Sequence, residues 1–232
     1  MSSPVPSSPP PSEKPRPPAY ASQGGAGMLA SFRHAWNGLI HTAVHQRNMR
    51  VHLVSALLVG LVGSGIPLGL AEKVTLIFCV LLIFFAEILN SALEHLVDLA
   101  TRHFDEKARL TKDAAAAGVL VLAIGTVVIF AAILVHNWET VASSGPQIAR
   151  QVALGLPLAL CVMVLVLPQP RSAWVDRLAF LGGALLLGVL ATYTVSSVFT
   201  AMNGGLLVIA GSAARQRRLE RTTPQPAGAL EG

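Results

Sequence analysis

The stretch 86-AEILNSALEHLVD-98 decides how this chain is built, because it sets ionisable side chains in a segment that is otherwise apolar enough to cross a membrane. At about 100° per residue along a helix, Glu87, Asn90, Glu94 and Asp98 fall within one arc of roughly 80°. A carboxylate near the centre of a bilayer costs about 2.5–3.5 kcal/mol on insertion scales, and such groups face a bundle interior or a water-filled cleft. Asp98 alone also fits the wetted end of a span. The stripe as a whole indicates a functional site on a membrane-spanning helix.

Composition places the rest of the chain in a membrane as well. Its 232 residues are 53% hydrophobic and only 12% charged, against roughly 25% charged residues in a soluble domain. The formal charge of +5 comes mostly from Lys and Arg between apolar segments, which is typical of cytoplasmic loops rather than of a nucleic-acid surface. Cys79 and Cys161 lie inside apolar runs without metal-ligand or disulfide spacing and are interpreted as packing residues. We expect no nucleic-acid partner.

Two regions precede the first predicted span. Residues 1–27 are rich in Pro, Ser and Gly and are predicted to form a disordered arm. From Met28 to about Gln46, apolar residues recur at helical spacing opposite a polar side. This pattern predicts a helix that lies on the membrane surface, and an ordinary helix docked in a bundle fits the same residues.

Three spans are then predicted, at about 51–70, 74–99 and 113–135. Basic residues before the first span and in the loop 101–113 mark the cytoplasmic side, because Lys and Arg concentrate in cytoplasmic loops. The segment 136–147 has no Lys or Arg and is predicted to lie on the opposite side.

Residues 148–212 are predicted to add two or three further membrane segments. The apolar run 178–210 has basic residues at both ends, so it has to cross the membrane an even number of times. Its 33 residues are short for two full spans. A hairpin of two short helices that turns near 193–197 satisfies the charges, whereas a single tilted span violates them. Residues 213–232 are predicted to form a basic, disordered cytoplasmic tail.

The polar stripe and the following Lys112-Asp113 supply the groups that phosphoryl transfer to a lipid requires. This reaction needs a divalent metal on the phosphates, a cation on the developing charge and a group that takes the hydroxyl proton. Carboxylates suit Mg²⁺, Lys112 suits phosphate oxygens, and a second carboxylate at the interface can take the proton. The sequence has neither a GxxxxGK[ST] loop nor a kinase GxGxxG motif with its partners, so a soluble kinase fold is excluded.

At these residues the chain resembles the small integral-membrane prokaryotic diacylglycerol kinases and their undecaprenol kinase relatives. The run from Glu87 to Asp98 and the Lys112-Asp113 pair followed by Ala residues resemble the two main blocks of that family. The stretches 32-FRHAWNGL-39 and 47-RNMRVH-52 resemble its surface helix and the beginning of its first span. The resemblance covers about residues 31–135.

The resemblance implies an all-α, polytopic membrane protein with an N-terminal surface helix and a three-span kinase bundle. The kinase-like domain is predicted over 28–147, and the extension over 148–212. The implied activity is transfer of the γ-phosphate of ATP, with Mg²⁺, to the hydroxyl of diacylglycerol or undecaprenol. A homotrimer in the inner (plasma) membrane of a bacterium is implied, with a composite site that faces the cytoplasm.

Residue roles follow from the same resemblance. Glu87 is expected to be the general base for the lipid hydroxyl, and Asn90 to orient the reacting groups. Glu94 and Gln46 are expected to bind the metal. The groups expected to line the nucleotide site are Lys112, Asp113, Asp98 and Arg50.

Gln46 departs from the family, which usually has Glu there as a second metal ligand. Glutamine offers a neutral carbonyl oxygen but lacks the charge that holds Mg²⁺, so a weak or inactive member that acts as a membrane scaffold is one alternative. A proton- or ion-coupled transporter subunit is another, in which Glu87 and Glu94 carry the ion. That alternative explains the stripe but not Lys112-Asp113. Because every predicted site residue precedes the extension, the extension is predicted to be dispensable for catalysis.

Overall fold

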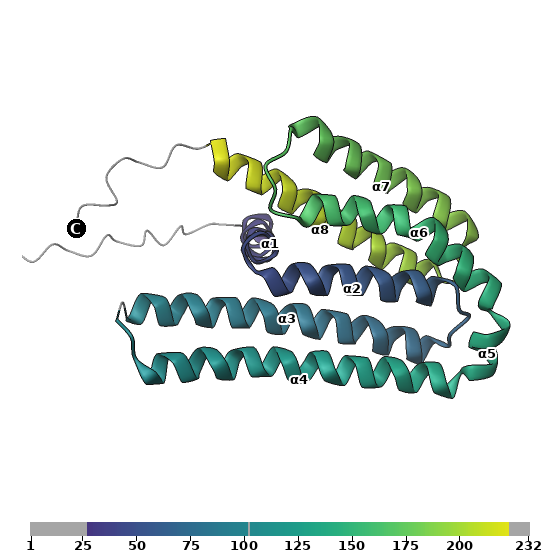
Figure 1. Ribbon diagram of the computed structural model, residues 1–232, viewed down its shortest axis with the longest axis horizontal. Coiled ribbons are helices and arrows are strands. Elements are labelled where there is room, and N and C mark those ends of the chain that lie inside the picture. The colour runs from purple at the N-terminus through teal and green to yellow at the C-terminus, as the bar shows by residue number, and fades with distance from the viewer. Residues whose placement is uncertain (1–26, 102, 223–232) are drawn as a thin grey trace, which may run out of the picture.

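The protein is all-helical over the residues that its computed structural model describes, which are 27–101 and 103–222 (Figure 1). The helices are α1 (Met28–His45), α2 (Arg47–Ser64), α3 (Leu70–Ala100), α4 (Glu106–His136), α5 (Trp138–Ser143), α6 (Gly145–Val166), α7 (Ala173–Tyr193) and α8 (Ser197–Thr222). Five of these are long and apolar enough to cross a membrane: α3, α4, α6, α7 and α8. The predicted class, a polytopic all-α membrane protein, is confirmed. Of the two or three further membrane segments that were predicted after the kinase-like region, the structure has three, α6, α7 and α8.

Helix α2 corresponds to the first predicted span, although it is not among the five described helices that are long and apolar enough to cross a membrane. Arg47 and Arg50 occupy its first turn. It nevertheless runs alongside α3 within the bundle (Figure 1). The α1 helix, the beginning of α2, the α3–α4 turn and the end of α8 all lie at the same end of the molecule. The basic residues of these elements therefore gather at one end, as the positive-inside rule predicts for a cytoplasmic face.

The predicted hairpin is present, and its helices are longer than expected. Helix α7 ends at Tyr193 and α8 begins at Ser197. The turn between them is attached to the far end of α2, because the Val195 N–H donates to the carbonyl oxygen of Ser64 at 2.8 Å. The Thr194 hydroxyl donates to the same oxygen at 3.3 Å.

The prediction of a disordered tail from residue 213 is wrong for residues 213–222, which continue α8. Arg217 explains the difference, because its guanidinium donates to the carbonyl oxygens of Val166 and Leu167 at 2.9 and 2.5 Å. These carbonyls end α6 and lack partners within their own helix. The basic side chains at this end of α8 thus cap another helix. The predictions for residues 1–26 and 223–232 fall outside the described part of the chain.

Helices α2 and α8 approach each other closely through two glycines. A Cβ atom on Gly60 would overlap the side chain of Asn203, and one on Gly63 would lie 2.7 Å from the ring of Phe199. Phe199 and Asn203 are both buried, at 0% and 1% exposure. Small residues let membrane helices pack with their backbones in near contact. Here Gly60 and Gly63 allow α8, a helix of the extension, to pack closely against α2.

One apolar core joins the kinase-like region to the extension. It includes buried side chains of α2, α3, α6 and α8, such as Leu57, Ile83, Leu158 and Leu207. The predicted boundary between residues 147 and 148 is therefore a division in the sequence but not in the packing. That the extension is dispensable for catalysis stays a prediction.

The α3–α4 pair forms a hairpin on the outside of this core. Asp105 caps α4, since its carboxylate accepts hydrogen bonds from the backbone N–H groups of Lys107 and Ala108 at 2.7 and 3.0 Å. Val119 is the one buried residue of α4. The segment 136–147, which was predicted to lie on the side opposite the basic loops, includes the short helix α5.

Candidate active site

The predicted site lies on the second half of α3, which runs toward the end of the bundle that also holds α1 and the beginning of α4 (Figure 1). Its residues pass from the interior to the surface along the helix. Glu87 is fully buried and Asn90 is 4% exposed, whereas Glu94 is half-buried and Asp98 is exposed. The stripe thus connects the protein interior to the basic end of the bundle.

The structure brings three predicted residues together around one carboxylate. The side-chain amide of Gln46 donates to Glu94 Oε2 at 3.0 Å, and that of Asn90 donates to Glu94 Oε1 at 3.0 Å. Gln46 also donates to the hydroxyl of Ser91 at 3.2 Å. Ser91 was not predicted as a site residue, although its place three residues before Glu94 puts it on the same side of the helix.

Gln46 reaches Glu94 because the helical conformation is interrupted at this residue. Its backbone is extended, with φ −86° and ψ 123°, and it separates α1 from α2. Arg50 was predicted to bind the nucleotide. In the structure it stabilises the junction between α1 and α2, because its guanidinium donates to the carbonyl oxygen of Val44 at 2.6 Å. Arg50 therefore holds the end of α1 in place.

Glu87 is the most buried ionisable group of the site. Within the described residues, neither of its carboxylate oxygens has a hydrogen bond of ordinary geometry, and the Oδ1 atom of Asn90 has none either. The backbone amide of Met49 approaches this carboxylate and interacts with it electrostatically. Buried polar atoms are usually paired, so these oxygens are available to groups that a substrate brings.

Lys112 and Asp98 meet across the α3–α4 hairpin, with Lys112 Nζ 2.5 Å from Asp98 Oδ1. Asp113 faces elsewhere: it pairs with Arg109 on its own helix, at 2.7 Å, and in the described part of the chain it makes no ion pair with either of these residues. Arg109 in turn contacts Glu106 at 2.5 Å. Sequence reasoning missed Arg109, although its spacing of four residues from Asp113 is that of a helical ion pair.

A group of imidazoles borders the site on α1. His41 and His45 have ring centroids 4.2 Å apart, and His95 of α3 lies 5.7 Å from His41. Partial burial lowers the pKa of His41 below its ordinary value, and the charges of His45 and His95 lower this pKa further.

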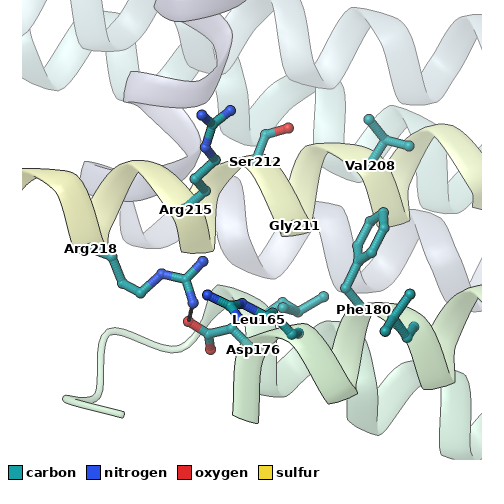
Figure 2. Close-up of a pocket in the computed structure, with 10 residues that line it drawn as sticks. Leu165, Asp176, Phe180, Val208, Gly211, Ser212, Arg215 and Arg218 are labelled. Carbon is teal, nitrogen blue, oxygen red and sulfur yellow. Dashed lines mark ion pairs between the residues drawn. The ribbon is translucent and has the colours of Figure 1, made fainter. Parts of the chain in front are cut away.

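A separate cavity lies between α6, α7 and α8 (Figure 2). Its volume is about 340 Å³, and Asp176 pairs with Arg218 at its edge, at 3.2 Å. Phe180 and Leu165 contribute apolar walls. None of the residues predicted from the stripe lines this cavity.

Comparison with known proteins decides the family. Residues 33–134 match the model of the family described as prokaryotic diacylglycerol kinase. A diacylglycerol kinase of Synechocystis sp. is 36% identical over 127 residues, which cover 54% of this chain and 71% of that protein. The chain belongs to the prokaryotic diacylglycerol kinase family.

Two other members of the family show the same relationship. The undecaprenol kinase of Bacillus subtilis is 36% identical over 97 residues, covering 42% of this chain and 79% of the relative. The diacylglycerol kinase of Escherichia coli (strain K12) is 30% identical over 111 residues, covering 48% and 91%. The family region comprises α1 to α4, whereas α6, α7 and α8 lie outside it. No solved structure matches the chain.

The donor set around Glu94 fits a bound Mg²⁺. In proteins Mg²⁺ takes one or two carboxylates and keeps several waters or substrate phosphates as its remaining ligands. Glu94 supplies a carboxylate near the surface, and Gln46 supplies an amide that has to turn its oxygen toward a cation. The two amide N–H groups on Glu94 stabilise its negative charge.

Proposed function

We propose that this chain is a lipid kinase that transfers the γ-phosphate of ATP to a membrane lipid hydroxyl at the cytoplasmic interface, with Mg²⁺ as cofactor. The observation that carries the proposal is the Glu87 carboxylate, which is fully buried and has no side-chain hydrogen-bond partner among the described residues, on the same stripe as the Glu94 cluster. It is supported by the names of the relatives, which are kinases of diacylglycerol and of undecaprenol.

Glu87 is placed to act on the lipid hydroxyl. A lipid that enters from the bilayer brings its hydroxyl to the depth of the buried end of the stripe. Glu87 accepts the hydroxyl proton while the hydroxyl oxygen bonds to the γ-phosphorus, and the bond between that phosphorus and the β–γ bridging oxygen breaks to release ADP. Asn90, whose Oδ1 atom has no hydrogen-bond partner in the described residues, orients the hydroxyl.

The nucleotide is assigned to the exposed end of the stripe. Lys112 holds phosphate oxygens, and Asp98 positions the Lys112 ammonium through their 2.5 Å contact. Glu94 and Gln46 hold Mg²⁺, which when bound neutralises phosphate charge. Asp113 is left out of this assignment because its carboxylate is paired with Arg109.

The geometry gives no support to a proton- or ion-coupled transporter. Such a path needs polar groups through the whole span. Between Val74 and Ala86, α3 carries no ionisable residue except Cys79, whose thiol is buried in the apolar half. The acidic stripe therefore ends at Glu87, about halfway along the helix.

Lipid phosphorylation by purified protein tests the proposal. Protein in detergent is incubated with [γ-³²P]ATP and Mg²⁺, and with either diacylglycerol or undecaprenol. We expect a labelled lipid, and we expect Glu87→Gln to lower the rate by about 10²–10⁴-fold, the usual contribution of a general base. The amide is nearly isosteric, so expression and oligomer size stay unchanged. No labelled lipid from either substrate would contradict the proposed kinase activity, and a Glu87→Gln variant that keeps more than about a tenth of the rate would remove Glu87 from this role.

A further inference from the structure

Helix α1 carries two histidines one turn apart, at positions i and i+4. This spacing places both imidazoles on one side of a helix, and it recurs in helical metal sites. The rings of His41 and His45 are 4.2 Å apart and inclined by 30°. Both side chains are exposed, and the lipid kinase mechanism proposed above assigns no role to them.

A third ligand comes from the extension. Glu220, in the last turns of α8, places Oε2 3.6 Å from His45 Nε2. One ligand atom each from His41, His45 and Glu220 lie within 4.8 Å of one another. The cluster thus joins the surface helix of the family region to a helix outside that region.

A hydrogen bond on the other ring nitrogen prepares His45 for metal binding. Its Nδ1 lies 3.0 Å from the carbonyl oxygen of His41. Because a carbonyl only accepts, Nδ1 carries the proton, and the lone pair of the neutral ring is left on Nε2. Histidines that bind metals usually make such a bond through the second nitrogen. The Nε2 lone pair and the Glu220 carboxylate then face each other, and a cation between them relieves their repulsion.

We propose that His41, His45 and Glu220 form a site for a divalent transition-metal ion, with Zn²⁺ as the ion that this donor set suits best. Two imidazoles and one carboxylate, with a further position for water, is an established zinc ligand set. Imidazole nitrogen suits Zn²⁺ and similar ions, whereas Mg²⁺ prefers oxygen. His95, 5.7 Å from His41 between ring centroids, is a fourth imidazole beside the cluster. The site is therefore distinct from the Mg²⁺ position at Glu94.

The bound ion would tie α8 to α1 directly beside the site. His45 precedes Gln46, and the Gln46 amide contacts Glu94. A metal at this position holds the end of α1 and the end of α8 together, and it does so from outside the family region.

Zinc binding to the full chain in detergent tests the proposal. Protein without a polyhistidine tag is washed with chelator and titrated with Zn²⁺ by calorimetry, in the presence of excess Mg²⁺. We expect one Zn²⁺ per chain, at least tenfold weaker binding in His45→Ala and in Glu220→Gln, and a metal-dependent rise in Tm that both variants lose. Co²⁺ in place of Zn²⁺ is expected to give the visible absorption of a site with nitrogen ligands.

Two controls separate this site from other sources of binding. His34→Ala removes another exposed histidine of α1 and is expected to leave Zn²⁺ affinity unchanged. Glu220→Gln keeps the size of the side chain, so an unchanged elution volume and helix content show that it folds. Wild-type protein that binds no Zn²⁺ would overturn the proposal and leave a His45–Glu220 ion pair. Equal affinity in Glu220→Gln and wild type would overturn the bridge between α1 and α8.

Discussion

The contact between Gly63 and Phe199 allows a sharp test of how the extension is joined to the family region. Replacing Gly63 with Ala adds a Cβ atom 2.7 Å from the Phe199 ring, whereas ordinary van der Waals contact begins at 3.4 Å. The ring is 0% exposed, so α2 and α8 have to separate to admit the methyl group. Overpacking of this kind costs about 1–3 kcal/mol.

Helix propensity has the opposite effect on the free energy of unfolding, because Ala is favoured over Gly in a helix by about 0.8–1.0 kcal/mol. Gly125→Ala on α4 is the matched control, since nothing lies within 4 Å of a Cβ at that position. Both variants gain the propensity term, and only Gly63→Ala meets the ring. The difference between their free energies of unfolding therefore isolates the contact, at about 1–3 kcal/mol.

Thermal unfolding of the two variants in the same detergent measures this difference. We expect Gly125→Ala to melt at or above the wild-type Tm and Gly63→Ala to melt below it. A chain of this size loses roughly 2–4 °C of Tm per kcal/mol. Phe199→Leu combined with Gly63→Ala is expected to recover part of the loss, as coupled neighbours do. Equal Tm values for Gly63→Ala and Gly125→Ala would refute the packing of α8 on α2.

Three further predictions concern the site and the extension. Gln46→Glu is expected to lower the Mg²⁺ concentration at half-maximal rate, because it adds a charged oxygen beside Glu94; an unchanged midpoint in a Mg²⁺ titration would show that residue 46 is not a metal ligand. Lys112→Gln is expected to raise the KM for ATP at least tenfold and to leave Tm nearly unchanged, since its pair with Asp98 is solvent-exposed and such pairs contribute about 0–1 kcal/mol. A chain that ends at Gln147 keeps every predicted site residue but lacks α7, α8 and most of α6, which uncovers the core side of α2; we expect a lower Tm with lipid phosphorylation retained, and a truncated protein that assembles but is inactive would show that the extension contributes to the site.

The membrane segments could be predicted from the sequence because their signals are local. Basic residues at both ends of the run 178–210 required an even number of crossings, and α7 and α8 form a hairpin whose turn lies within the predicted range 193–197. The stripe on α3 followed from the 100° rotation per residue. Gln46 was placed near a metal ligand only through the family resemblance, and its contact with Glu94 lies 48 residues away in the sequence.

What the sequence did not reveal depends on contacts between distant segments. Residues 213–222 continue α8, and Arg217 holds them through hydrogen bonds to carbonyl groups at the end of α6. The sequence pattern around Arg217 does not predict these distant partners. The direction of the Asp113 side chain, by contrast, could have been predicted from the sequence. Consecutive helical residues point about 100° apart, so Lys112 and Asp113 could not both face Asp98.

The glycines of α2 affect how natural variation in this family should be interpreted. Gly60 and Gly63 face Asn203 and Phe199, which lie outside the family region. A substitution at either glycine is therefore expected to be accompanied by a change in residues 199–203 rather than in α3 or α4. In this chain the ring of Phe199, which lies outside α1 to α4, limits which side chain is tolerated at residue 63.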